Sequence, residues 1–189
     1  MACGTRDEPP SGGGEARLIS QGSWRVSAER SRVGFKVRKM GLYFVKGRFK
    51  RVNGSVEVGA DGVPVGGWLR IDASSVSTRM PPRDWHLRTR DFLAVKQHPE
   101  IRFDVERVEH AQGGAMVVLA VLTLRGDEAR VPLTSHWHVS ERGGSGDAVL
   151  HVSGTVDRHE LGLRPRRPVD WIVGRDVYLD AVLHLEPLQ

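Results

Sequence analysis

Apolar and polar side chains alternate with a period of two along most of this chain, and no other feature limits its fold so strongly. Val33, Phe35 and Val37 are separated by glycine and a basic residue, and the same alternation returns at 131–137 and 177–185. Successive side chains of a β-strand point to opposite faces, so the pattern indicates strands with one buried face. Eight or nine such segments follow one another without a crossover helix. This order predicts an antiparallel meander joined by hairpins.

Closure of such a meander into a barrel removes the exposed strand edges. A chain of 189 residues with 39% apolar residues suits one domain of this kind, and 22 glycines and 10 prolines supply many turns. We therefore expect an all-β, antiparallel, eight-stranded barrel over residues 21–189. Residues 1–20 form a Pro/Gly-rich tail with too little apolar surface to pack, so we expect this tail to be disordered.

One segment, residues 74–103, interrupts the alternation in the middle of the chain. Pro82 is typical of the first turn of a helix, and Asp84 suits the positive end of a helix dipole. We predict one short helical insertion near 82–95 that closes an end of the barrel. Its expected buried side consists of Trp85, Leu87, Phe92, Leu93 and Val95.

The basic charge of the chain has two interpretations. The net charge is +5, carried by 23 Arg and five Lys, and no run of five like charges occurs. A solvated basic outer face explains this distribution, and a surface for nucleic acid or an anionic membrane is the alternative. No RNP-like, zinc-finger or helix-turn-helix pattern is present, so we expect no nucleic-acid partner.

The sequence also bears on membrane insertion, disulfides and location. The longest apolar run, Ala115–Leu124, is too short to cross a bilayer, so no membrane span is expected. Cys3 is the single cysteine, which leaves no disulfide framework and no cysteine-based metal site within the chain. No signal peptide is visible, which predicts a soluble cytoplasmic protein. The alternative is a lipoprotein, because Ala2-Cys3-Gly4 before a Pro/Gly/Ser-rich tether is similar to the start of a mature one.

The inward-facing positions of the predicted strands are apolar and would form the lumen. Glycines at 47 and 54 face the same way and would leave space there. A cavity would favour a long uncharged hydrocarbon, at about 0.8 kcal/mol per buried CH₂. The pattern alone leaves a cavity and a filled core equally open. The candidate lumen residues are Val33, Phe35, Val37, Val45, Phe49, Leu69, Ile71, Ile101, Phe103, Leu122, Leu133, Trp137, Val152, Leu179 and Leu183.

Two further groups of residues could carry chemistry. His136 and His138 leave one face of a strand together, a geometry that binds zinc when a third ligand is present. Alternation places both outside the barrel, so we expect surface histidines and no metal. Arg83, Asp84 and His86 could form a charge relay, but no serine lies in an elbow motif and no nucleophile is in register. We expect Asp84 to cap the helix and Arg83 or Arg88 to pair with Asp91.

Several motifs resemble those of one protein family. The segment SSVSTxxxxRDxHLRTxDFLxxxxHPEIRF, residues 74–103, is similar to the signature of the YceI-like family, lipocalin-like proteins associated with polyisoprenoid and other long-chain lipids. Residues 31–58, LTLRG at 122–126 and RHELGL at 158–163 also resemble family elements. The chain has Lys39 where the family often has His, and Leu161 where it has Phe.

The resemblance spans 23–187 and implies a lipocalin-like barrel that sequesters or carries a long-chain apolar lipid, isoprenoid-like, in its lumen. It implies no catalytic residue and no cofactor, and it assigns an architectural role to the barrel-end helix residues Arg83, Asp84, Trp85, His86, Leu87 and Phe92. Two alternatives stay open: a metal-dependent small-molecule enzyme that uses His136 and His138, and a protein-interaction barrel with a filled core. The sequence does not distinguish a monomer from a homodimer.

Overall fold

The computed structural model describes residues 20–110, 115–139, 147–163 and 173–188. The predicted tail, apart from Ser20, lies outside the described residues, as do most of the loop at 141–147 and of the connection at 164–174. The elements in chain order are β1 (Gly22–Val26), β2 (Arg32–Lys39), β3 (Tyr43–Phe49), β4 (Val52–Val58), β5 (Pro64–Asp72), a 3-10 turn (Ala73–Ser75), β6 (Val76–Ser77), α1 (Pro81–Arg88), β7 (Glu100–His110), β8 (Ala115–Leu124), β9 (Asp127–Val139), β10 (Ala148–Asp157) and β11 (Val173–Pro187).

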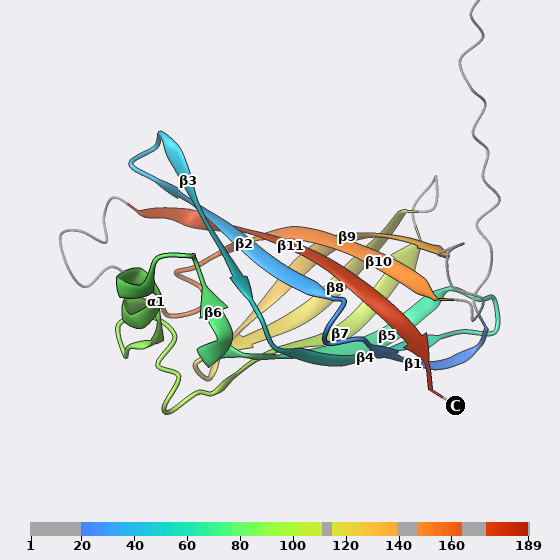
Figure 1. Ribbon diagram of the computed structural model, residues 1–189. Helices are drawn as coiled ribbons and strands as arrows, with labels where there is room; N and C mark the ends of the chain where they lie inside the picture. Colours follow the sequence, from blue (N-terminus) through green and yellow to red (C-terminus); the bar gives the residue numbers. More distant parts are fainter. Residues whose placement is uncertain (1–19, 111–114, 140–146, 164–172, 189) are drawn as a thin grey trace, which may run out of the picture.

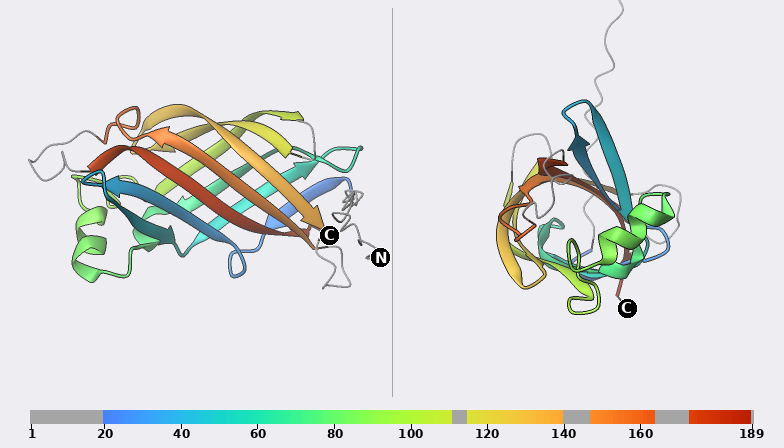
Figure 2. Two further views of the ribbon diagram at one scale, coloured as in Figure 1. Left: turned by 90° about the horizontal axis from the view of Figure 1, so that it is seen from above. Right: turned by 90° about the vertical axis from the view of Figure 1, so that its left-hand side faces the viewer.

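The strands form a closed antiparallel barrel (Figure 1). Strand β1 pairs with β4 on one side and with β11 on the other, which completes the ring. The ring contains eight strands: β1, β4, β5, β7, β8, β9, β10 and β11. The predicted fold class is confirmed, and the view along the barrel in Figure 2 shows the strands enclosing a common interior.

Strands β2 and β3 continue the sheet beyond this ring. Strand β11 is long enough to pair with both β1 and β2. Its residues 185–187 pair with β1, and its residues 173–182 pair with β2. The β2–β3 hairpin extends from the barrel at the end where α1 lies (Figures 1 and 2). Its far edge pairs with β6 at only two positions, Arg48 with Ser77 and Phe49 with Val76.

The helix is shorter than predicted. It ends at Arg88, because Thr89 has an extended backbone and its hydroxyl donates a hydrogen bond of 2.7 Å to the His86 carbonyl. The chain then folds back, with the Leu93 amide bonded to the Leu87 carbonyl at 3.0 Å, so that Leu93 is buried at the barrel end. The prediction that Trp85 belongs to the buried side is wrong, since Trp85 is 69% exposed.

Side chains of α1 hold the helix to the segment before it. The Asp84 carboxylate accepts hydrogen bonds from the Thr78 amide at 2.7 Å and from its hydroxyl at 2.5 Å, so it joins the helix to the preceding turn. Arg83 donates to the Thr78 hydroxyl and carbonyl. Arg88 donates to the carbonyls of Ser74 and Val76, both at 2.8 Å. Arg83 and Asp84 therefore tie the helix to Thr78, directly after β6, and Arg88 ties it to Ser74 and Val76. The prediction that Asp84 caps the helix is wrong, because the N-cap residue is Met80.

The barrel half next to α1 is filled with side chains. Ile71 on β5 is 1% exposed, and Leu122 on β8 and Val131 on β9 are also buried. Val76 of β6 and Leu93 of the segment after α1 belong to the same cluster. We call the segment from Val76 to Leu93, which contains β6 and α1, the plug. The plug and the strands therefore share one dense core at this end.

Candidate ligand-binding site

A cavity of about 120 Å³ occupies the part of the barrel farther from α1. On β7 its lining runs from Phe103 to Val108 and on β8 from Met116 to Ala120, which is the side of these strands away from the plug. The chain positions on its wall are Val26, Val33, Ser55, Val56, Pro64, Gly66, Gly67, Trp68, Leu69, Phe103, Val105, Val108, Met116, Val118, Ala120, Leu133, Ser135, Leu150, Val152, Leu179, Asp180, Ala181 and Leu183.

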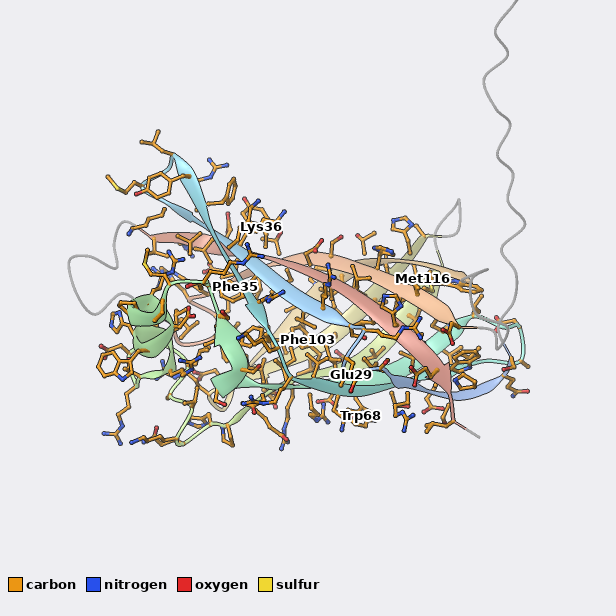
Figure 3. The ribbon with its side chains drawn as sticks, viewed as in Figure 1. Glu29, Phe35, Lys36, Trp68, Phe103 and Met116 are labelled. Atoms are coloured by element: carbon orange, nitrogen blue, oxygen red, sulfur yellow. The ribbon has the colours of Figure 1, made fainter. Side chains whose placement is uncertain are left out.

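The strand pleat explains why this wall is apolar. Leu179, Ala181 and Leu183 on β11 face inward, while Asp180 between them is exposed on the outer face. Phe103 and Met116 are among the lumen side chains, and the Trp68 side chain lies outside (Figure 3). The surface offered to a ligand is therefore almost entirely hydrocarbon.

Ser135 is the exception in this wall. It follows Leu133 by two residues on β9, so it faces the lumen, and it is 0% exposed. Its hydroxyl oxygen has no hydrogen-bond partner among the described residues. A buried hydroxyl without a partner costs free energy, and a ligand oxygen that reached Ser135 would remove that cost.

Met116 is the most adaptable side chain of the wall. It is buried, lies on β8 and is paired across the ladder with Ser135. An unbranched thioether has three rotatable bonds and fills irregular spaces at little cost, so it can also move aside. The wall can thus change shape where Ser135 offers its hydroxyl.

The fifteen candidate lumen residues fall into three groups in the structure. Those that line the cavity are Val33, Leu69, Phe103, Leu133, Val152, Leu179 and Leu183. Ile71, Ile101 and Leu122 are buried in the filled half. The remaining residues are only partly buried: Phe35, Val37, Val45 and Phe49 on the β2–β3 hairpin, and Trp137 near the end of β9. Of these, Phe35, Phe49 and Trp137 pack against the core.

Sequence reasoning missed several wall residues that the same alternation could have found. Ser135 is the middle residue of the alternating set Leu133, Ser135 and Trp137, so it faces the same side as its two neighbours. Ala181 holds the same position between Leu179 and Leu183. Both side chains are small or polar, so a search for large apolar residues does not identify them as wall residues. Met116 and Ala120 sit in the apolar run of β8, where alternation gives no clear face.

The glycines at 47 and 54 do not leave the space predicted for them. A Cβ at position 47 would lie within 3.0 Å of three atoms of the Phe35 ring, so that ring already fills the position. A Cβ at position 54 would lie 2.7 Å from the Trp68 carbonyl oxygen and 3.0 Å from Leu69 and Val26 side-chain atoms. These glycines permit close packing of their neighbours, and the cavity lies elsewhere.

The structure also shows where the candidate catalytic and metal-binding residues lie. His136 is exposed on the outer face of β9, and the side chain of His138 lies outside the described residues. Within the ranges that the structure covers, no three His, Cys, Asp or Glu side chains are arranged to hold a metal ion. His86 is stacked edge-on against Phe92 at 5.0 Å, and its Nε2 lies 3.6 Å from Asp91, which suits packing of the plug.

No helix in the described segments is long and apolar enough to cross a membrane.

The chain is similar to bacterial proteins in sequence and in fold. A UPF0312 protein of Vibrio cholerae is 24% identical over 164 residues, which cover 83% of this chain and 81% of that protein. The crystal structure of Burkholderia cenocepacia BcnA matches with a TM-score of 0.74 at 18% identity and covers 84% of this chain and 98% of that one. A polyisoprenoid binding domain from Saccharophagus degradans, implicated in plant cell wall breakdown, matches with a TM-score of 0.66 at 18% identity, covering 89% of this chain and the whole of that one.

The family assignment follows from a match over most of the barrel. The model of the YceI-like domain matches residues 24–185, from the first strand to near the end of the last. This chain therefore belongs to the YceI-like domain family.

Proposed function

We propose that this protein binds an apolar lipid of the isoprenoid class in the lumen of its barrel, and sequesters or carries it without altering it. The observation that carries the proposal is the hydrocarbon-lined cavity, with Ser135 as the one unpartnered buried hydroxyl described in its wall. The polyisoprenoid binding domain of Saccharophagus degradans, which has a similar fold, supports the choice of ligand class.

The size of the cavity limits how the ligand enters. A volume of about 120 Å³ is close to that of an engineered apolar cavity of ~150 Å³ that binds benzene. This space takes about one isoprene unit without rearrangement. A longer chain requires wall side chains to move, and Met116 is suited to do so. Each CH₂ buried in this way contributes about 0.8 kcal/mol, so a long chain can repay the cost of expansion.

The chemistry of the wall also limits the ligand. The lining residues offer no charged side chain to the lumen, so a ligand charge would be buried without a partner, which is costly. Ser135 favours a neutral oxygen, such as that of a prenol or a quinone. We therefore expect neutral lipids with a single polar group to bind more tightly than fatty-acid anions.

Purification followed by organic extraction tests this proposal. The full-length protein should yield a neutral isoprenoid lipid by mass spectrometry, in an amount that approaches one per chain. The variant Ala181→Phe, prepared in parallel, should yield little, because the new ring would occupy the cavity. Extraction of no lipid from the wild type, together with no uptake of added polyprenol, would favour the filled-core alternative. One bound metal per chain, lost in His136→Ala, would instead favour the enzyme alternative.

A further inference from the structure

The tip of the β2–β3 hairpin exposes large apolar side chains where a turn normally carries polar ones. Leu42 is 83% exposed, and Met40, Tyr43 and Phe44 beside it are each more than two-fifths exposed. The hairpin extends past the ring of the barrel, so its tip is far from the core (Figures 1 and 2). Phe44 packs edge-on against Tyr178 on one side, and among the described residues the tip of the hairpin, Leu42 above all, stays open to solvent.

The turn itself does not require these residues. Met40 and Gly41 both have positive φ, 53° and 69°, a conformation that Asn-Gly adopts with least strain. Met40 therefore occupies a position that favours a smaller and more polar residue. Met40 weakens the turn and leaves an apolar group in water, so folding does not explain it. Contact of this side chain with a binding partner does.

The hairpin is also strongly basic. Three of the five lysines of the chain lie in it and Lys50 follows it directly, and no Asp or Glu occurs between Glu29 and Glu57. On its outer face Lys36 lies directly opposite Lys46, a like-charge pair that destabilises a sheet. Lys36 lies on the outer side of β2 in Figure 3. No ion pair joins Lys36, Lys46 or Arg48 to a carboxylate of the described chain, although Asp180 lies on the adjacent strand.

The helix contributes further exposed apolar side chains to the same end of the molecule. Met80 and Trp85 are exposed on and beside α1, and α1 lies at the barrel end from which the hairpin extends (Figure 2). The exposed Arg90 follows the helix and adds a cation to this end. Apolar groups framed by cations thus occupy one end of the barrel. We call the set Met40, Leu42, Tyr43, Phe44, Lys36, Lys46, Met80 and Trp85 the basic apolar end.

We infer that the basic apolar end docks on an anionic phospholipid surface, with the hairpin tip inserted among the acyl chains and the lysines at the headgroups. Apolar tips partition into the boundary region, and juxtaposed cations are attracted by anionic lipids. A second copy of this chain is a poorer occupant, because it would bring the same lysines against one another. A nucleic acid would suit the cations but would leave Met40 and Leu42 without an apolar environment.

Vesicle binding by the full-length protein tests this inference. Sedimentation with phosphatidylcholine vesicles should capture little protein, and vesicles that also contain phosphatidylglycerol should capture much more, less so at high salt. The variants Leu42→Ser/Phe44→Ser and Lys36→Gln/Lys46→Gln should each lower partitioning about tenfold. The matched controls, Val65→Ser for an exposed apolar residue and Arg25→Gln/Arg107→Gln for charge, should partition like the wild type.

A fluorescent probe locates the contact independently. In a Cys3→Ser background, NBD attached at Leu42→Cys should brighten on anionic vesicles, while NBD at Val65→Cys should not. Equal vesicle binding by the wild type and both hairpin variants would overturn the inference. So would retention of a single-stranded oligonucleotide that requires Lys36 and Lys46 while vesicles are not bound, or concentration-dependent dimers that Leu42→Ser abolishes. The hairpin and control substitutions are at exposed residues, so near-native melting should accompany each result. Lipid extraction from the lumen is a separate measurement, so failure here leaves the proposed function standing.

Discussion

At the scale of single residues, Asp84 shows how the plug depends on one carboxylate. Burial by itself raises the pKa of Asp84, but hydrogen bonds from the Thr78 hydroxyl and amide outweigh that effect, so the net pKa is lowered. The ionised form is therefore bound more tightly by the native structure than by the unfolded chain. Its contribution to stability is present above the unfolded pKa near 3.9 and is lost as pH falls through the lower native pKa.

Replacement of Asp84 by Asn should lower the free energy of unfolding by about 1–3 kcal/mol at neutral pH, because charge-assisted hydrogen bonds to Thr78 are lost. Urea denaturation measures the change. The difference between variant and wild type should shrink as pH is lowered below about 4. Asp180→Asn, at an exposed site on β11, is the matched control and should change stability little. A constant difference from neutral to acidic pH would show that the charge of Asp84 is not what matters.

Ser135 gives a prediction about ligand selectivity. Loss of its hydroxyl in Ser135→Ala removes an unpartnered buried group, so the ligand-free protein should become slightly more stable. Affinity for a prenol should fall about fivefold, while affinity for the corresponding hydrocarbon should hold or rise. Titration of the two lipids, followed by native mass spectrometry, compares them. Parallel changes in both affinities would mean that Ser135 contacts no ligand oxygen.

At the scale of elements, the β2–β3 hairpin contains a matched pair of glycines. A Cβ on Gly47 would collide with the Phe35 ring, whereas a Cβ on Gly34 would meet two carbonyl oxygens at an ordinary 3.5 Å. Gly47→Ala should therefore cost about 1–3 kcal/mol by overpacking, and Gly34→Ala should cost little. Phe35→Leu/Gly47→Ala should be more stable than the sum of its single changes implies, as measured by a double-mutant cycle. Additive effects would show that the ring moves away freely.

The elements were predicted well where a local pattern decides them. Alternation around Val33 and Leu133 identifies strands because a pleat with one buried face requires it. The end of α1 at Arg88 was missed, because the Thr89 hydroxyl ends the helix through a bond that propensity does not reveal. Exposure of Trp85 was missed for a different reason. The face of α1 that packs is determined by hydrogen bonds of Asp84 and Arg88 to the preceding segment, at Thr78 and Ser74, and not by apolar content.

At the scale of the whole molecule, closure of the barrel could be predicted but the position of its cavity could not. A strand count and antiparallel order lead to a ring, and the ring defines which side chains face inward. Whether space remains depends on the summed volumes of residues from eight strands. Ile71 and Leu122 fill one half, while small residues such as Ala120 and Ala181 leave room in the other. No single segment contains that information.

The central claim is that the half of the lumen away from α1 holds an apolar ligand, and two substitutions test it most directly. Ala181→Phe places a ring in the cavity, and Ile71→Trp overpacks the filled half. Polyprenol uptake by native mass spectrometry and thermal melting would be measured for both variants and the wild type.

Ala181→Phe should melt near or above the wild type and take up no polyprenol, because filling a cavity restores lost contacts. Ile71→Trp should be destabilised by about 1–3 kcal/mol and should still take up polyprenol at temperatures where it remains folded. Strong destabilisation of Ala181→Phe, together with no uptake of polyprenol by the wild type, would contradict the account and identify the interior as a filled core.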